Sequence, residues 1–245
     1  MGGDKLGSRM TYGNYLQLDK LLTLQSGPDG HDPLPSNHEM HFIVVHQAFE
    51  LWFKQINREL EDTLQLMNND EIDETNIPVI VRHLERCSEI FRLLASQWKV
   101  METLSPQDFL AFRDRLGTSS GFESWQLRTL EMLLGLKSEQ RIGGMDPMEH
   151  NKKLHSEGKL SDEVMANMER IATLPSLYDV LLRWLERTPV NGVSGDKEVM
   201  TEFVESHISS MIEHGETVIS HMVKIGHGNE ETIRPRITAG IDAAR

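Results

Sequence analysis

The chain carries 11 histidines among its 245 residues, and histidine is the commonest metal ligand and the side chain that titrates nearest neutrality. One histidine group lies within residues 38–50. It differs from the zinc-protease pattern, which places two residues between the glutamate and the second histidine, because only one residue separates Glu39 from His41. His46 follows among aromatic residues, where a histidine is more often a hydrogen-bonded core residue than a catalytic one. Glu50, one turn later, is a candidate partner for its ring.

A second group repeats every seven residues near the end of the chain: His207, His214 and His221. Seven residues are about two helical turns, a rise of about 10.5 Å, which is too long for two of these side chains to bind one ion. Haem needs only one proximal imidazole beside an apolar pocket, so one histidine of this face suits an axial haem ligand. Buried or half-exposed histidines that bind no metal are the alternative. A carboxylate-bridged di-iron site would need two Glu-x-x-His pairs, and the sequence has none.

A third group surrounds Arg113, which follows apolar residues and precedes a turn of serine, threonine and glycine at residues 117–121. The planar guanidinium matches a carboxylate at two points, and the amides and hydroxyls of the turn can donate further hydrogen bonds. The segment therefore predicts an anion cradle. The alternative is that Arg113, Asp114 and Arg115 form an ordinary solvated charge cluster.

The elements that must position these groups are helices. Apolar residues recur at three- and four-residue spacing between polar stretches at 26–37, 71–78, 137–158 and 186–196. This spacing predicts amphipathic helices over 39–67, 77–98, from Ser105 and Pro106 onward, 123–136, 161–186 and 198–225. Pro175 is expected to kink or split the fifth of these. No alternating pattern predicts a strand, so the expected fold class is all-α.

Composition excludes several classes of protein. The length of 245 residues suits one large helical domain or two small ones, and the hydrophobic content of 38% can bury a sizeable core. A membrane span would need about 18 uninterrupted apolar residues, and the first residues lack a signal-peptide pattern, so we expect no membrane partner and a cytoplasmic location. The net charge of -13 repels phosphate backbones, so we expect no nucleic-acid partner. Cys87 is the only cysteine, and its apolar neighbours predict a buried residue.

Several multi-residue blocks, taken together, resemble the tryptophan 2,3-dioxygenase family. They occur in the family's order, at residues 11–16, 18–19, 21–22, 39–43, 46–47, 50–54, 112–114 and 116–122. The resemblance is strongest over 10–137, and residues 226–245 form a divergent C-terminal tail. It implies an all-α, bundle-like single domain, spanning 1–245, that encloses a haem pocket.

The resemblance implies an enzyme with haem b as cofactor and O2 as co-substrate. Such an enzyme inserts O2 across the indole C2–C3 bond of tryptophan or a substituted tryptophan and yields an N-formylkynurenine-type product. It also implies a homo-oligomer, usually a tetramer, with a dimer as the other possibility.

The resemblance assigns roles to individual residues. His46 resembles the distal histidine that hydrogen-bonds the indole N–H, Phe42 resembles a wall of the indole pocket, and Arg113 resembles the carboxylate-binding arginine. His214 opens a His-x-x-Thr-Val pattern and resembles the axial ligand, with His221 as the weaker alternative. The other expected site residues are Phe109, Ser120 and Gly121 beside the substrate, Trp98 at the haem cavity, and Tyr12, Tyr15 and Leu16, which complete a neighbouring subunit's pocket.

Two departures from the family pattern motivate alternatives. Phe109 stands where the family usually has a tyrosine, and residues 226–231 replace a glycine- and threonine-rich loop that binds the amino-acid end of the substrate. One alternative is a haem-dependent monooxygenase that forms an oxindole or hydroxyindole in natural-product biosynthesis. The other is a haem-binding or structural helical protein without turnover, since a fold does not by itself imply a function.

Overall fold

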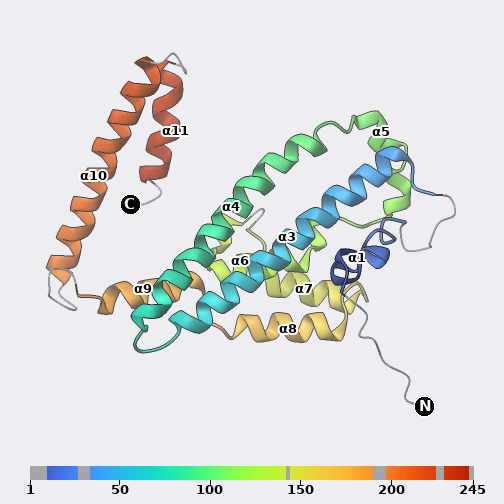
Figure 1. The fold of residues 1–245 in the computed structure, drawn as a ribbon, viewed down its shortest axis with the longest axis horizontal. Helices are drawn as coiled ribbons and strands as arrows, with labels where there is room; N and C mark the ends of the chain where they lie inside the picture. Colours follow the sequence, from blue (N-terminus) through green and yellow to red (C-terminus); the bar gives the residue numbers. More distant parts are fainter. Residues whose placement is uncertain (1–9, 27–33, 142–143, 190–196, 225–228, 243–245) are drawn as a thin grey trace. The chain divides into compact units, whose positions relative to one another are not determined.

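The computed structural model describes residues 10–26, 34–141, 144–189, 197–224 and 229–242, and no strand occurs in these ranges. The all-α prediction is confirmed. No helix among the described residues combines the length and the apolar character that crossing a membrane requires. The α-helices (Figure 1) are α1 (Tyr12–Leu16), α2 (Leu18–Leu21), α3 (Asn37–Met67), α4 (Ile77–Met101), α5 (Pro106–Leu110), α6 (Trp125–Leu134), α7 (Pro147–Ser156), α8 (Asp162–Ala172), α9 (Leu177–Arg187), α10 (Lys197–Lys224) and α11 (Glu230–Asp242).

Contacts divide the chain into two compact units, Met1–Val180 and Leu181–Arg245. In the first unit, α3 and α4 form a long helical hairpin, and α3 also packs against α6 (Figure 1). The core of the hairpin lies toward its loop, where Ile56 and Leu60 of α3 are 0% and 1% exposed and meet a buried stripe on α4. The first half of α3, which carries the aromatic residues around His46, is only half-buried. That half is therefore free to line a cavity.

Helix ends follow local sequence signals. The hydroxyls of Ser36, Ser105, Ser124 and Ser161 each accept a hydrogen bond from the backbone N–H three residues later, at the starts of α3, α5, α6 and α8. Such caps satisfy amides that have no partner within the helix. The expected helix over 161–186 is split into α8 and α9 around Pro175, as predicted.

Four helices were not predicted from the sequence: the short α1 and α2, and the longer α7 and α11. α7 lies inside the stretch 137–158, which was expected to be a polar interruption; it begins because Asp146 accepts from the Glu149 N–H at 2.9 Å and Pro147 suits a first turn. α11 lies in the expected divergent tail and contains Pro235, which disfavours a helix in a sequence-based prediction. Packing against other helices stabilises α7 and α11. α7 packs on α6 and α8, and α11 packs on α10.

The second unit contains the last residues of α9 and the helical hairpin of α10 and α11. Ile219 of α10 and Ile233 of α11 are buried. The Arg234 guanidinium of α11 joins the two helices through an ion pair with Glu216 of α10, and it also pairs with Glu230 within α11 at 2.6 Å. These contacts, rather than the sequence pattern of α11 alone, account for the helix.

Cys87 is buried on α4, as predicted, with 5% of its surface exposed. Burial, together with the nearby Glu59 carboxylate, raises the pKa of its thiol to about 11. Because the thiolate is the reactive form, this cysteine is an inert core residue near neutral pH.

Gly135 ends α6 with φ +83, and a side-chain Cβ there would lie 2.8 Å from the Ser176 Cβ and 3.0 Å from the Tyr178 Cβ. We expect Gly135→Ala to lower the free energy of unfolding by about 2–4 kcal/mol, because left-handed strain and overpacking add. Urea denaturation measures this change. Gly158→Ala is the matched control, since Gly158 has φ +73 but open space around it and should lose only about 1–2 kcal/mol. Equal losses in the two variants would show that the predicted clash does not exist.

Candidate functional site

His46 and Phe42 stand one turn apart on the half-buried part of α3. The His46 Nδ1 lies 2.8 Å from the Phe42 carbonyl oxygen, and the two ring centroids are 4.0 Å apart. Because a carbonyl oxygen can only accept, Nδ1 carries the proton and donates it to this bond. The Nε2 atom of the neutral ring is then left with a lone pair that can accept a hydrogen bond from a ligand.

Glu50, the expected partner of His46, is engaged elsewhere. The Gln126 side-chain amide donates to both the Glu50 backbone carbonyl and the Glu50 carboxylate, each at 2.9 Å. The Asn57 side-chain amide in turn donates to the Gln126 backbone carbonyl at 3.0 Å. These bonds join α3 to the first turn of α6 and so hold Ser124, the cap of α6, beside the helix that carries His46.

Three phenylalanines form a wall next to His46. The Phe42 ring centroid lies 5.8 Å from that of Phe109 and 5.5 Å from that of Phe112, and Phe109 meets Phe112 edge to face at 5.4 Å. Such tilted and edge-on pairs are the favoured geometry for aromatic rings. Phe112 is almost fully buried, whereas Phe42 and Phe109 are half-buried and face the cavity. The wall therefore offers apolar ring surface to a flat ligand.

Arg113 begins a 3-10 turn, η2 (Arg113–Leu116), directly after Phe112. Its Nη1 donates to the Gly117 carbonyl at 2.9 Å, which holds the guanidinium over the turn. Its neighbour Arg115 pairs with the buried carboxylate of Glu39, with 2.8 Å between Nη1 and Oε2. The charged segment is thus more than a solvated cluster, because one arginine lines the cavity and the other reaches a buried anion.

The turn after Arg113 supplies small polar groups. The Ser119 hydroxyl donates to the Leu116 carbonyl at 2.5 Å, and the Ser120 hydroxyl accepts from the Phe122 N–H at 3.3 Å, capping the 3-10 turn Gly121–Glu123. Gly121 has no Cβ, and nothing lies within 4 Å of where one would stand. The backbone here is open to a ligand.

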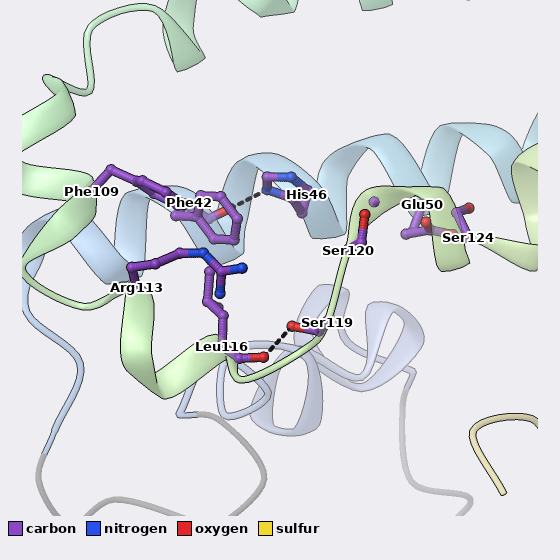
Figure 2. A pocket seen from close by; sticks show the side chains of 10 residues that line it. Phe42, His46, Glu50, Phe109, Arg113, Leu116, Ser119, Ser120 and Ser124 are labelled. Atoms are coloured by element: carbon purple, nitrogen blue, oxygen red, sulfur yellow. Dashed lines mark hydrogen bonds between the residues drawn. The ribbon is translucent and has the colours of Figure 1, made fainter. Parts of the chain in front are cut away.

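These segments enclose one cavity of about 390 Å³, within the range of roughly 300–1,000 Å³ that small-molecule sites occupy. Figure 2 shows Phe42, Phe109 and Arg113 at one end, His46 in the middle, and Glu50 with Ser124 at the other end. Its walls are mostly apolar, with a few polar groups placed along them. The cavity is lined by Phe42, His46, Glu50, Phe109, Arg113, Leu116, Ser119, Ser120, Gly121 and Ser124.

Six of the expected site residues lie in this cavity: Phe42, His46, Phe109, Arg113, Ser120 and Gly121. Of the other four, Glu50 was expected only as a partner of His46, and Leu116, Ser119 and Ser124 were not predicted as site residues. Leu116 and Ser119 fall within the block 116–122 that resembles the family, so that block was a signal for them. Ser124 carried no signal, since it lies just beyond the block.

Other expected residues lie outside the cavity. Tyr12 and Tyr15 of α1 are 77% and 74% exposed and Leu16 is 40% exposed, and none of them lines the cavity of its own chain. Trp98 of α4 packs on Phe49 with 5.1 Å between ring centroids. Their assigned roles stay predictions.

The histidines of α10 belong to the second unit. His207, His214 and His221 are all exposed there, while Gly215 and Ile219 are buried on the side that faces α11. The three imidazoles therefore share a side of α10 that α11 leaves open. Among the described residues, no group of three or more His, Cys, Asp or Glu side chains could hold a metal ion by itself. The histidines of α10 therefore suit an iron-containing group that needs only one protein ligand.

Comparison with known proteins decides the family. The model of the family "Tryptophan 2,3-dioxygenase" matches residues 2–237. The chain belongs to the tryptophan 2,3-dioxygenase family. A tryptophan 2,3-dioxygenase of Anopheles gambiae is 44% identical over 193 residues, which are 77% of this chain and 47% of that protein. One of Sorangium cellulosum is 37% identical over 216 residues, 88% of this chain and 52% of that protein.

A third family member, tryptophan 2,3-dioxygenase 2 of Ralstonia nicotianae, is 38% identical over 203 residues, 82% of this chain and 55% of that protein. This chain spans about half the length of these curated relatives. The resemblance to the tryptophan 2,3-dioxygenase family found in the sequence is confirmed.

Proposed function

We propose that this protein is a haem-dependent oxygenase that uses O2 to insert both oxygen atoms across the C2–C3 bond of the indole ring of tryptophan or a substituted tryptophan. One observation carries the proposal. A single apolar cavity brings together a histidine with a free Nε2, an aromatic wall, and an arginine at one end. An indole ring needs an acceptor for its N–H and flat apolar walls, and an amino acid's carboxylate needs a cation.

Each group has a defined task in this proposal. The His46 Nε2 accepts the hydrogen bond of the indole N–H and fixes the rotation of the ring against Phe42. The Arg113 guanidinium, already oriented by Gly117, binds the carboxylate of the substrate's amino-acid group. Holding the reacting carbons in one orientation supplies a large part of the rate enhancement, because it removes rotational freedom before the reaction. The apolar walls exclude water from the ring.

The residues fit a haem. His214 and its two neighbours on α10 offer exposed imidazoles, one of which suffices as a proximal ligand. We propose His214 as the axial ligand, with His221 as the alternative, and Trp98 beside the macrocycle. Haem b, when bound, supplies the iron chemistry that activates dioxygen.

The assembly is part of the same proposal. The exposed side chains of Tyr12, Tyr15 and Leu16 would complete the pocket of a neighbouring subunit in a homo-oligomer, a tetramer by family resemblance. Both units of the chain would then act as one haem-binding domain in the cytoplasm.

A monooxygenase is the second candidate, favoured by Phe109. Its ring carries no hydroxyl that could donate to the substrate's amino-acid end, so the substrate can be held differently. Incubation of the reduced protein with tryptophan and isotopically labelled dioxygen, followed by mass spectrometry, separates the two. We expect a product that has gained both oxygen atoms from dioxygen. An oxindole or hydroxyindole with one labelled oxygen would establish the monooxygenase, and a preparation without Soret absorption after haem reconstitution would refute both.

A further inference from the structure

Arg113 lies in a short 3-10 turn rather than in a long helix. The turn η2 spans only Arg113–Leu116, and a 3-10 turn of this length is held by few backbone hydrogen bonds. Its position in the cavity must therefore be fixed by side chains on either side of Arg113.

One anchor precedes Arg113 and one follows it. Phe112 is 3% exposed and packs on Phe42 and Phe109. Two residues after Arg113, the Arg115 guanidinium pairs with the Glu39 carboxylate, whose side chain is 6% exposed. The first anchor ties the turn to the aromatic wall of the cavity. The second ties it to the start of α3 through a buried carboxylate, although the Arg115 side chain itself is 37% exposed.

Glu39 is itself rigidly placed. It occupies the first turn of α3, where its N–H donates to the Ser36 hydroxyl at 3.1 Å. A carboxylate there is favoured by the helix dipole. The Glu39 carboxylate therefore offers Arg115 a fixed anionic point on the helix that also carries Phe42 and His46.

A third contact orients Arg113 itself. Gly117 adopts φ 56 and ψ -127, a conformation that residues with a Cβ rarely adopt. This backbone conformation turns the Gly117 carbonyl toward the Arg113 Nη1. The other N–H groups of the Arg113 guanidinium can then bind a ligand. The orientation of Arg113 thus depends on where the turn that ends at Gly117 is held.

We propose that the Glu39–Arg115 ion pair is a positioning device for Arg113, and that it sets the preference of the cavity for indoles that carry a carboxylate. This inference rests on the proposed function. Neither residue of the pair lines the cavity, so neither touches the ligand. Two-point binding of a carboxylate by a guanidinium is sensitive to direction, so release of the turn weakens that binding while the indole pocket stays intact.

Calorimetric binding of L-tryptophan and of tryptamine to the full chain, without reductant or turnover, tests the inference. Tryptamine keeps the indole and the ammonium group but lacks the carboxylate. We expect Arg115→Met to reduce the affinity ratio of tryptophan to tryptamine about tenfold, the scale of one weakened charge-assisted hydrogen bond. Arg115→Lys keeps the charge and should recover part of the ratio. Both ligands are measured on the same preparation, so a loss of folded protein cancels.

The double variant shows whether Arg115 acts through Arg113. Arg113→Met should itself lower the ratio, and adding Arg115→Met to it should change the ratio no further, since coupled residues are not additive. Glu39→Gln should reproduce the effect of Arg115→Met. Arg92→Met is the matched control, because Arg92 pairs with Glu89 on an exposed part of α4, and it should leave the ratio unchanged.

Three other outcomes would contradict the positioning role of the Glu39–Arg115 pair. Equal weakening of tryptophan and tryptamine in Arg115→Met, or an unchanged ratio, would overturn the positioning role while leaving the proposed function in place. An additive loss in the double variant would show that Arg115 acts independently of Arg113 and would overturn it as well. A wild-type chain that binds neither ligand would contradict the proposed function itself, and the inference would fall with it.

Discussion

Replacement of His214 by alanine is expected to abolish stoichiometric haem binding. Loss of a partner that merely supports a metal ligand costs roughly 10- to 100-fold in affinity, so loss of the ligand itself should cost at least about a hundredfold. The absorbance ratio of the Soret band to the protein band after reconstitution and gel filtration measures this. Imidazole added to His214→Ala should restore part of the Soret band, because it can occupy the place of the lost side chain.

The neighbouring histidines provide the matched controls. His207 and His221 lie two turns before and after His214 on the same exposed side of α10, so their replacement by alanine disturbs the helix equally. Both variants should keep full haem content. Retention of haem in His214→Ala together with its loss in His221→Ala would move the axial ligand to His221, and retention in all three would contradict a haem ligand on this helix.

Replacement of His46 by alanine is expected to lower kcat/KM for tryptophan about a hundredfold while haem content stays unchanged. The physical reason is orientation: a small misplacement of a bound reactant can cost on the order of 100-fold in rate. In the structure the Nδ1 proton of His46 is committed to the Phe42 carbonyl, which leaves Nε2 as the acceptor for the indole N–H. Steady-state kinetics together with the Soret band checks both halves of the prediction.

A substrate without the donor is the control for His46. 1-Methyltryptophan has no indole N–H, so His46→Ala should change its turnover little, apart from the space that the lost ring leaves. An equal loss with tryptophan and with 1-methyltryptophan would show that His46 acts on something other than the N–H. Wild-type rates with tryptophan in the variant would remove His46 from the mechanism altogether.

His46 lies on a segment that the sequence alone placed correctly, whereas Arg113 lies in a 3-10 turn beyond the end of α5, where the predicted helix was expected to continue. The apolar residues within 39–67 recur at helical spacing, and the Ser36 hydroxyl caps the helix by accepting from the N–H three residues later. α3 was therefore predictable from local information. The same holds for Ser105 with Pro106 at the start of α5, and for the break at Pro175. Caps, prolines and periodicity act over one or two turns, and that range is available in a sequence.

What the sequence could not determine is which side chain meets which over a long separation. The sequence suggested a hydrogen bond between Glu50 and His46. In the folded chain His46 instead bonds the Phe42 carbonyl, and Glu50 accepts from the Gln126 amide, 76 residues away in the chain. The sequence singled out Arg113 for anion binding but gave Arg115 no partner, and only the approach of η2 to the start of α3 placed Arg115 on the buried Glu39 carboxylate.

Tertiary contacts likewise decided α11, one of the helices that the sequence did not predict. α11 forms although Pro235 lies within it, because Ile233 is buried and Arg234 pairs with Glu216 of α10. The helical periodicity, the cap residues and the types of the chemical groups were thus determined by the sequence itself. The partners of Glu50, Arg115 and Arg234 were decided by the tertiary structure, because burial and charge pairing depend on which distant surfaces are brought together when water is excluded between them.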